Sequence, residues 1–204
     1  MTETEDETKG TARPLPEKEG LWDLAEEVIR FTLIALLFIV PIRIYIAQPY
    51  IVSGASMHPT FESGEYLIID QLSYRFEEPS RGEVVVFRFP QDPGKFFIKR
   101  VIGLPGETVI SGATGLSIIT QSGGTEALDE PYVAAGTYAD FSVTLKEDEY
   151  FVMGDNRPAS LDSRIFGPVA RHYIVGRTLV RLLPPTRLGV FPGFYDYSGT
   201  FAGK

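Results

Sequence analysis

The stretch GEVVVFRFPQDPGKFFIKRVIG, residues 82–103, decides the fold class of this chain. Its two halves are rich in Val, Ile and Phe, which favour the pleated, half-buried surface of a β-sheet. Between them, PQDPGK (90–95) supplies the Pro, Asp and Gly that form tight turns. The stretch therefore predicts two strands joined by a turn.

Similar strand-like runs lie on both sides of this stretch. No segment of helical periodicity follows residue 47, and turns containing Pro or Gly are frequent. We therefore expect a mainly β body, folded on itself as a partly closed barrel so that few strand edges are exposed. The further runs are EYLIID (65–70), DEYFVMGDNR (148–157) and YIVGRTLVRLL (173–183).

The segment LWDLAEEVIRFTLIALLFIVPIRIYIA, residues 21–47, has a different pattern. From residue 28 to residue 47, only Arg30 and Arg43 interrupt an apolar run that is about long enough to span a bilayer. Both arginines lie toward the ends of the run, where long side chains can reach the lipid headgroups. We predict an amphipathic turn followed by a single, uncleaved transmembrane helix.

Two other interpretations of this segment stay open. It could be a buried core helix, because its strictly uncharged part, residues 31–42, is short. It could also be a cleavable signal peptide, which needs small residues before the cut. A cut after Ala47 would place Tyr45 at one of those positions, which argues against cleavage.

The remaining segments complete the expected domain organisation. Residues 1–20 are acidic and nearly free of large apolar residues, which predicts a flexible tail. Residues 48–185 form the predicted β domain, within which 111–140 is a variable hairpin or loop excursion. Residues 186–204 lack a second apolar span and are expected to form a C-terminal surface segment.

Composition excludes several classes of function. The chain of 204 residues carries a formal net charge of −8 and no evident basic patch, unlike a nucleic-acid binder. It has no cysteine, which excludes a thiol nucleophile, a disulfide and a thiolate metal site. With only two histidines, a histidine-rich zinc site is not expected either, and we predict no cofactor or metal.

The first stretch with catalytic potential is IVSGASMHPTF, residues 51–61, which contains Ser53, Ser56 and His58. On an extended strand Ser56 and His58 share a face, but this geometry is poor for a base that a carboxylate must also orient. The second histidine, His172, has no acid close in sequence. A structural or solvent-facing role is the preferred interpretation for both histidines.

A neutral lysine can also activate a serine. Lys95 lies in a turn and is expected to be solvated, whereas Lys99 lies inside the apolar run FFIKRVIG. Burial lowers the pKa of a lysine, and reaching about 7.5 from a reference near 10.4 requires ~4 kcal/mol. Taken alone, however, the strand pattern favours an edge-strand Lys99 that faces water.

A third stretch, MGDNRPASLDSRIFGP (153–168), by itself predicts only a salt-bridged loop. Together, the three stretches resemble the bacterial type I signal peptidases, which are membrane-bound Ser-Lys proteases. The resemblance runs from the anchor to about residue 180, and four boxes in one order behind a predicted anchor make it specific. The boxes are GASMHPTF (54–61) for the nucleophile, GEVVVFRFP (82–90) for the following strand, FIKRVIGLPGE (97–107) for the lysine and GDNRPASLDSR (154–164).

The resemblance implies a role for each matching residue. Ser56 is expected to be the nucleophile that forms an acyl-enzyme, and Lys99 the general base that later protonates the leaving amine. Ser160 is expected to orient the lysine amine. Supporting ion pairs are implied for Arg100, Asp155, Arg157, Asp162 and Arg164.

The chain departs from many members of the family at one position. Gly54 stands where those members carry a serine whose hydroxyl helps to form the oxyanion hole, as in the glycine branch of the family. The hole is then expected to rely on backbone N–H groups, chiefly that of Ser56. Ser53 is one residue away and, on strand alternation, is expected to point elsewhere.

The resemblance also implies a fold, a substrate and a location. The fold is a mostly antiparallel β-sheet or partly closed barrel, whose exposed apolar surface rests on the lipid bilayer. The substrates are signal peptides of exported preproteins, with small residues at the first and third positions before the cut. The location is the bacterial cytoplasmic membrane, crossed once, with the catalytic domain on the outer face.

Two other functions are alternatives to this one. A repressor-type Ser-Lys protease should carry a helical DNA-binding domain, and the predicted anchor argues against it. A catalytically inactive, membrane-bound β module that binds exported chains is the alternative from a different class. The presence of Ser56, Lys99 and Ser160 argues against that alternative.

Overall fold

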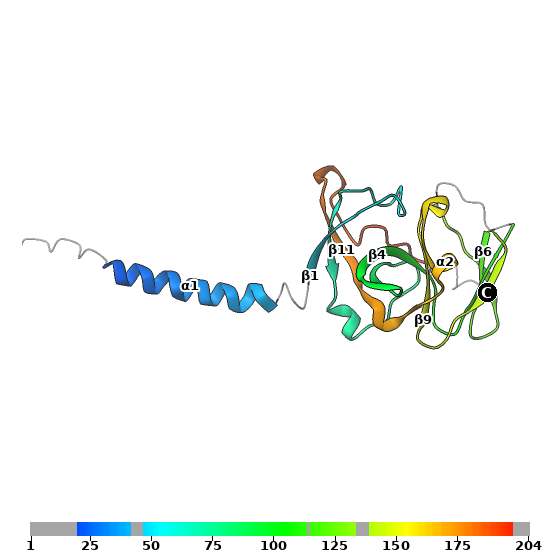
Figure 1. The fold of residues 1–204 in the computed structure, drawn as a ribbon, viewed down its shortest axis with the longest axis horizontal. Helices are drawn as coiled ribbons and strands as arrows, with labels where there is room; N and C mark the ends of the chain where they lie inside the picture. Colours follow the sequence, from blue (N-terminus) through cyan, green and yellow to red (C-terminus); the bar gives the residue numbers. More distant parts are fainter. Residues whose placement is uncertain (1–19, 42–46, 114, 134–138, 198–204) are drawn as a thin grey trace, which may run out of the picture. The chain divides into compact units, whose positions relative to one another are not determined.

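The structure, a computed structural model, divides the chain into two compact units, Met1–Val40 and Pro41–Lys204. The helix α1 (Leu21–Pro41) is the described element of the first unit, and all described strands belong to the second (Figure 1). The tail predicted for residues 1–20 lies outside the described residues except for Gly20. The structure describes residues 20–41, 47–113, 115–133 and 139–197.

The helix α1 covers most of the segment predicted to cross a membrane. Its Leu, Ala and Glu residues are good helix formers, and the helix runs without interruption from Leu21 to Pro41. Within the described part of the chain, no helix meets the length and apolar character needed to cross a bilayer. Residues 42–46 of the predicted segment lie outside the described residues, and Ala47 already belongs to a strand.

The second unit is mainly β, as predicted, and each pair of neighbouring strands is antiparallel. The larger sheet runs in the order β1 (Ala47–Ile51), β2 (Tyr66–Asp70), β11 (Ile174–Leu183), β3 (Val84–Phe89), β4 (Asp92–Gly103), β9 (Glu149–Met153) and β10 (Val169–Ala170), with β12 (Gly189–Val190) paired to β11. The smaller sheet runs in the order β7 (Thr125–Ala127), β6 (Gly115–Ile119), β5 (Thr108–Gly112) and β8 (Phe141–Thr144).

The predicted partial closure into a barrel is wrong for the described strands, which form two open sheets. The larger sheet ends at β1 on one side and at β10 on the other. Because β10 has only two residues, this edge offers few unpaired backbone groups. The fold therefore limits its exposed edges by shortening a strand rather than by closing the sheet.

The stretch 82–103 forms the predicted hairpin of β3 and β4, with Val86 opposite Ile98. Four consecutive residues of β3, Val84–Phe87, are buried. Alternate side chains contribute to two different core clusters, so both faces of this strand are covered. Burying each such side chain contributes about 1.5–3 kcal/mol to the free energy of folding. The hairpin is therefore a major part of the core of this domain.

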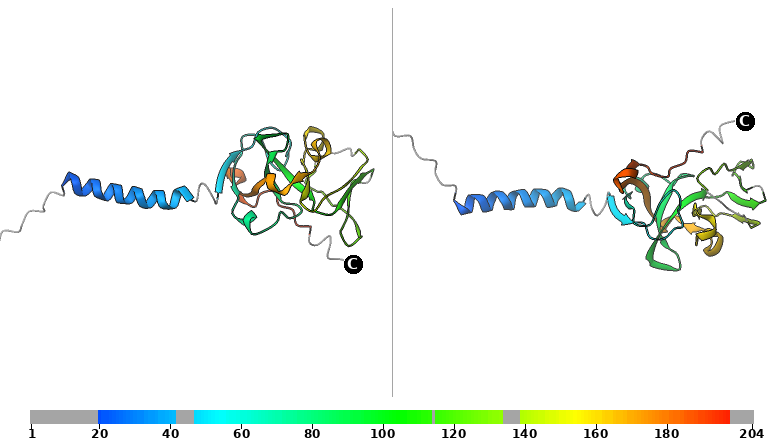
Figure 2. Two further views of the ribbon diagram at one scale, coloured as in Figure 1. Left: turned by 60° about the horizontal axis from the view of Figure 1, so that its bottom comes forward. Right: turned by 90° about the horizontal axis from the view of Figure 1, so that it is seen from above.

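The predicted excursion at 111–140 and the C-terminal segment both join the core of the smaller sheet. Ile118 of β6, Phe151 of β9 and Tyr197 belong to one buried cluster. The expectation that residues 186–204 lie on the surface therefore does not hold for Tyr197, which is 3% exposed. Figure 2 shows the described part of this last segment, residues 186–197, running from the end of β11 back across the unit. The short helices are η2 (Ser73–Arg75), η3 (Arg157–Ala159), α2 (Ser163–Phe166), η4 (Arg171–Tyr173) and η5 (Pro185–Arg187).

Candidate active site

Ser56 lies in the loop between β1 and β2, which we call the nucleophile loop (residues 52–65). Met57 and Phe61 are buried in a core cluster and fasten the loop to the larger sheet. The amide of Phe61 also donates a hydrogen bond of 2.9 Å to the carbonyl of Met57. Close packing on both sides of a turn leaves the half-buried Ser56 little freedom to move.

The segment that follows β9 packs directly against this loop. The amide of Asn156 donates to the carbonyl of Ser56 at 3.0 Å, and its side-chain amide donates to the carbonyl of Ala55 at 3.0 Å. A Cβ atom on Gly154 would lie 2.2 Å from Ser160 Oγ and 2.4 Å from the Ser56 carbonyl oxygen. A glycine is therefore needed at the place where the two segments meet.

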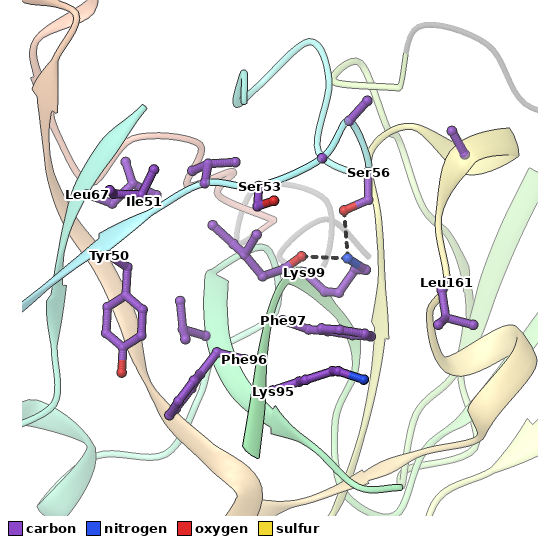
Figure 3. Close-up of a pocket in the computed structure, with 16 residues that line it drawn as sticks. Tyr50, Ile51, Ser53, Ser56, Leu67, Lys95, Phe96, Phe97, Lys99 and Leu161 are labelled. Atoms are coloured by element: carbon purple, nitrogen blue, oxygen red, sulfur yellow. Dashed lines mark hydrogen bonds between the residues drawn. The ribbon is translucent and has the colours of Figure 1, made fainter. Parts of the chain in front are cut away.

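The structure brings Lys99, and not Lys95, to Ser56. Lys99 Nζ lies 2.7 Å from Ser56 Oγ and 2.8 Å from the carbonyl oxygen of Ile98 (Figure 3). The side chain of Lys95 is exposed and forms an ion pair with Asp92 at 2.9 Å. Lys95 is thus solvated as predicted, although it lies at the start of β4 and not in a turn, and Lys99 is in hydrogen-bond contact with the candidate nucleophile.

Lys99 does not face water, contrary to what the strand pattern alone favours. Its strand β4 lies between β3 and β9 inside the sheet, and the residue is only 4% exposed. Burial lowers the pKa of Lys99 to about 8, although the charges of Asp162 and Asp155 oppose this shift. An amine with this pKa is about half neutral at pH 8, which suits a general base.

Next to Lys99 in β4, Arg100 forms a fully buried ion pair with Asp155. Arg100 Nε and Nη2 donate to the two carboxylate oxygens at 2.8 and 2.6 Å. Thr60 of the nucleophile loop donates its hydroxyl to the same carboxylate. Asp155 is thus compensated by Arg100 and tied to the loop that carries Ser56, a link that the sequence alone did not reveal.

The other predicted ion-pair residues form a second cluster behind the site. Arg164 donates to both oxygens of Asp162 at 2.8 Å, and the amide of Gly154 donates to Asp162 at 3.0 Å. Burial by itself would raise the pKa of Asp162, but these hydrogen bonds lower it below its ordinary value. Arg157 pairs with Glu130, a partner absent from the predicted set.

Two further residues with predicted roles, Ser160 and Gly54, take no part in these ion pairs. Ser160 is buried, and its hydroxyl lies near enough to Asp162 to help lower the pKa of that carboxyl, but it makes no hydrogen bond to Lys99 among the described residues, so its orienting role stays a prediction. Gly54 has a φ of +91°, and its amide donates to Ser63 Oγ at 3.4 Å. Because a Cβ there would meet nothing within 4 Å, the backbone conformation rather than space favours glycine.

The remaining candidates of the nucleophile loop differ in their surroundings. Contrary to the expectation that it points elsewhere, Ser53 also lines the pocket beside Ser56, because β1 ends at Ile51 and strand alternation no longer applies. His58 is exposed, and its Nδ1 lies 2.8 Å from Glu62 Oε1. The hydrogen bond of Ser56 Oγ in the described structure is the one with Lys99, so Lys99 is the candidate base that the geometry supplies.

Ser56 and Lys99 line a pocket of about 460 Å³ on the larger sheet. Figure 3 shows the Ser56–Lys99 contact beside the aromatic side chains that lie along β4. A mostly apolar pocket with few polar groups suits an apolar segment of substrate. Its apolar lining includes Tyr50, Ile51, Leu67, Val86, Phe96, Phe97, Ile98, Ala159 and Leu161.

The sequence that carries Ser56 and Lys99 matches a known protein family. Residues 25–183 match the family model described as signal peptidase, peptidase S26. The chain belongs to this family. The signal peptidase match spans most of α1, the nucleophile loop, β4 and the Asp155–Arg164 segment, so every candidate site residue lies inside it.

Individual signal peptidases are similar over most of their length. A probable signal peptidase I-1 of Synechocystis sp. is 34% identical over 85% of this chain and 90% of its own. The signal peptidase I V of Bacillus subtilis is 34% identical over 78% of this chain and 96% of its own. A solved signal peptidase I from Enterococcus faecalis is 35% identical, with a TM-score of 0.42, and covers 50% of this chain and 97% of its own.

Proposed function

We propose that this chain is a membrane-anchored serine endopeptidase that removes N-terminal signal peptides from exported preproteins. One observation carries the proposal: the buried amine of Lys99 lies 2.7 Å from Ser56 Oγ. A lysine with a pKa of about 8 can accept a proton from a serine hydroxyl near neutral pH. Membership of the signal peptidase family supports the same reaction class.

The proposed reaction proceeds through an acyl-enzyme. Neutral Lys99 takes the hydroxyl proton of Ser56 while Oγ attacks the scissile carbonyl carbon. The backbone N–H of Ser56 donates to the developing oxyanion, as proposed for a site with glycine at position 54. Protonated Lys99 then gives its proton to the leaving amine, and a water molecule activated by Lys99 hydrolyses the ester.

The surrounding residues keep Lys99 usable as a base. Arg100 and Arg164 compensate the carboxylates of Asp155 and Asp162, so these charges raise the pKa of Lys99 less than they would unpaired. We assign to Ser160 the orientation of the lysine amine. The buried position of Ser160 beside Asp162, whose charge acts on Lys99, supports this assignment.

Substrate choice and location are part of the same proposal. The apolar pocket beside Ser56 is assigned to the segment before the cut, with small side chains at its first and third positions. We propose that α1 anchors the chain in the cytoplasmic membrane and that the catalytic unit lies on its outer face. Large apolar side chains of α1 that are exposed include Trp22, Leu24, Val28, Phe31, Leu33, Leu36, Leu37 and Ile39.

Cleavage of a preprotein by the detergent-solubilised chain tests this function. We expect Ser56→Ala and Lys99→Ala each to abolish cleavage, and Ser53→Ala to retain most of it, because it is the Ser56 hydroxyl that is hydrogen-bonded to Lys99. An active Lys99→Ala variant would rule out the dyad, and an inactive but folded Ser53→Ala variant would refute the assigned oxyanion hole. A wild-type chain that binds the preprotein without cutting it would favour the inactive binding module.

A further inference from the structure

The C-terminal segment, residues 191–197, lies beyond the residues 25–183 that match the family model, yet it is built into the catalytic unit. The amide of Tyr195 donates to the carbonyl of Gly82 at 3.3 Å, and Tyr197 is buried in the core cluster of the smaller sheet. The segment follows β12 and crosses the unit (Figure 2). On this path it contacts both halves of the proposed site.

The first contact is with Arg100, the neighbour of Lys99 in β4. Arg100 Nη1 donates to the carbonyl oxygen of Gly193 and, at 2.8 Å, to that of Gly82. The guanidinium carbon of Arg100 also lies 3.8 Å from the ring centroid of Tyr132, whose hydroxyl is hydrogen-bonded to that of Tyr197. The C-terminal segment therefore holds Arg100 directly through Gly193 and indirectly through Tyr197.

The second contact is with the nucleophile loop. A Cβ atom on Gly193 would lie 2.7 Å from Thr60 Cγ2 and 2.9 Å from Phe61 Cε2. Gly193 also has a φ of +79°, a conformation that side chains disfavour. Thr60 in turn donates to Asp155, the carboxylate partner of Arg100. One glycine thus touches the loop that carries Ser56 and the arginine that adjoins Lys99.

We propose that Gly193 and Tyr197 are positioning residues for catalysis, and that the C-terminal segment sets the distance between Ser56 and Lys99. The proposal rests on the proposed function of this dyad. Proton transfer needs the two heavy atoms at hydrogen-bond distance, and a displacement of about 1 Å can cost about a hundredfold in rate. The Arg100–Asp155–Thr60 chain of bonds transmits the position of Gly193 to both partners.

The full-length chain in detergent provides the first test, with preprotein cleavage as the readout. Gly193→Ala is expected to lower kcat at least about tenfold while KM stays within about twofold, because alignment rather than binding is disturbed. Gly189→Ala is the matched control, since its Cβ would meet only the Arg187 carbonyl oxygen, at 4.0 Å. A folded Gly193→Ala variant with the kcat of the control would overturn the proposal.

Tyr197→Phe decides the matter if Gly193→Ala does not fold. It removes one hydroxyl next to Tyr132 and keeps the buried ring, so the core stays packed. We expect kcat to fall about threefold with KM unchanged, because Arg100 loses part of its support. An unchanged kcat in this variant would overturn the role of the segment.

A second readout does not depend on cleavage: the pH dependence of Lys99 acetylation by acetic anhydride, followed by mass spectrometry. The charges acting on Lys99 are Asp162 and Asp155, held by Arg164 and Arg100 respectively. A loosened Arg100 leaves Asp155 less compensated, so the labelling midpoint should rise by about half a pH unit.

This shift is expected in Gly193→Ala and Tyr197→Phe and not in Gly189→Ala. An identical labelling midpoint in the wild type and all three variants would overturn the proposal. Failure of the wild-type chain to cut the preprotein would reject the proposed function instead, and the labelling shift would still show whether the segment positions Lys99.

Discussion

At the scale of single residues, Lys99 is a charged side chain placed where its charge is costly. Burial lowers its pKa to about 8, and two nearby carboxylates limit that shift. Only the neutral amine can take a proton from Ser56, so kcat/KM is expected to rise with pH through about 8 and then to level off. Initial rates of preprotein cleavage between pH 6 and 10 measure this profile.

The control for this pH profile is His58→Ala. His58 is exposed and paired with Glu62, so its removal should leave the midpoint unchanged. The dyad assignment would be refuted by a midpoint near the ordinary histidine value of about 6.5 that disappears in His58→Ala.

The residues that can be predicted from the sequence are those that lie in recognisable local motifs. Ser56 and Lys99 each belong to such a motif, and the resemblance of these motifs to those of the signal peptidases, not their own pattern, predicted that the two residues meet. Thr60 and Gly193 could not be found in this way, because Thr60 bonds to Asp155 across 95 residues and Gly193 bonds to Arg100 across 93. Such contacts depend on how the strands pack, which no local pattern encodes.

At the scale of elements, the end of β9 and the nucleophile loop meet at Gly154. A methyl group there would overlap Ser160 Oγ and the Ser56 carbonyl, so Gly154→Ala must push the two segments apart. We expect a loss of cleavage of about a hundredfold or more, because Ser56 moves away from Lys99. Steady-state kinetics and thermal unfolding, measured on the same preparations, separate this loss from unfolding.

Gly112→Ala, in β5, is the matched control for Gly154→Ala. Its Cβ would meet nothing within 4 Å, so cleavage should stay close to the wild-type level. A Gly154→Ala variant as active as this control would mean that the contact between the two segments does not position Ser56.

Helices and strands could be predicted where apolar and polar residues follow a regular pattern. How the strands are arranged in sheets, which depends on long-range packing, could be predicted less well. The β3–β4 hairpin follows from runs of Val, Ile and Phe around a turn. Closure of the sheet does not follow from such runs, because it depends on which strands lie at the edges. Likewise, the aromatic residues near the C-terminus gave no sign that Tyr197 enters the core between distant strands.

At the scale of the whole molecule, the division into two units separates the proposed tasks of anchoring and catalysis. All residues of the proposed site lie within Pro41–Lys204, which has its own buried clusters. A unit with its own core can be expected to fold without the preceding helix. Deleting residues 1–40 should therefore leave the cleavage of a short, soluble signal-peptide substrate within about threefold of the full chain.

The same deletion of residues 1–40 should abolish most membrane binding, although it leaves cleavage nearly unchanged. The exposed Leu, Ile, Val and Phe side chains of α1 would each gain about 1.5–3 kcal/mol when buried in lipid. Flotation with phospholipid vesicles is therefore expected to carry the full chain and to lose at least about nine-tenths of the truncated one. The inactive Ser56→Ala full chain should float like the wild type, because Ser56 lies outside α1. Equal flotation of the truncated and full chains would instead assign membrane binding to the catalytic unit and deny α1 its role as the anchor.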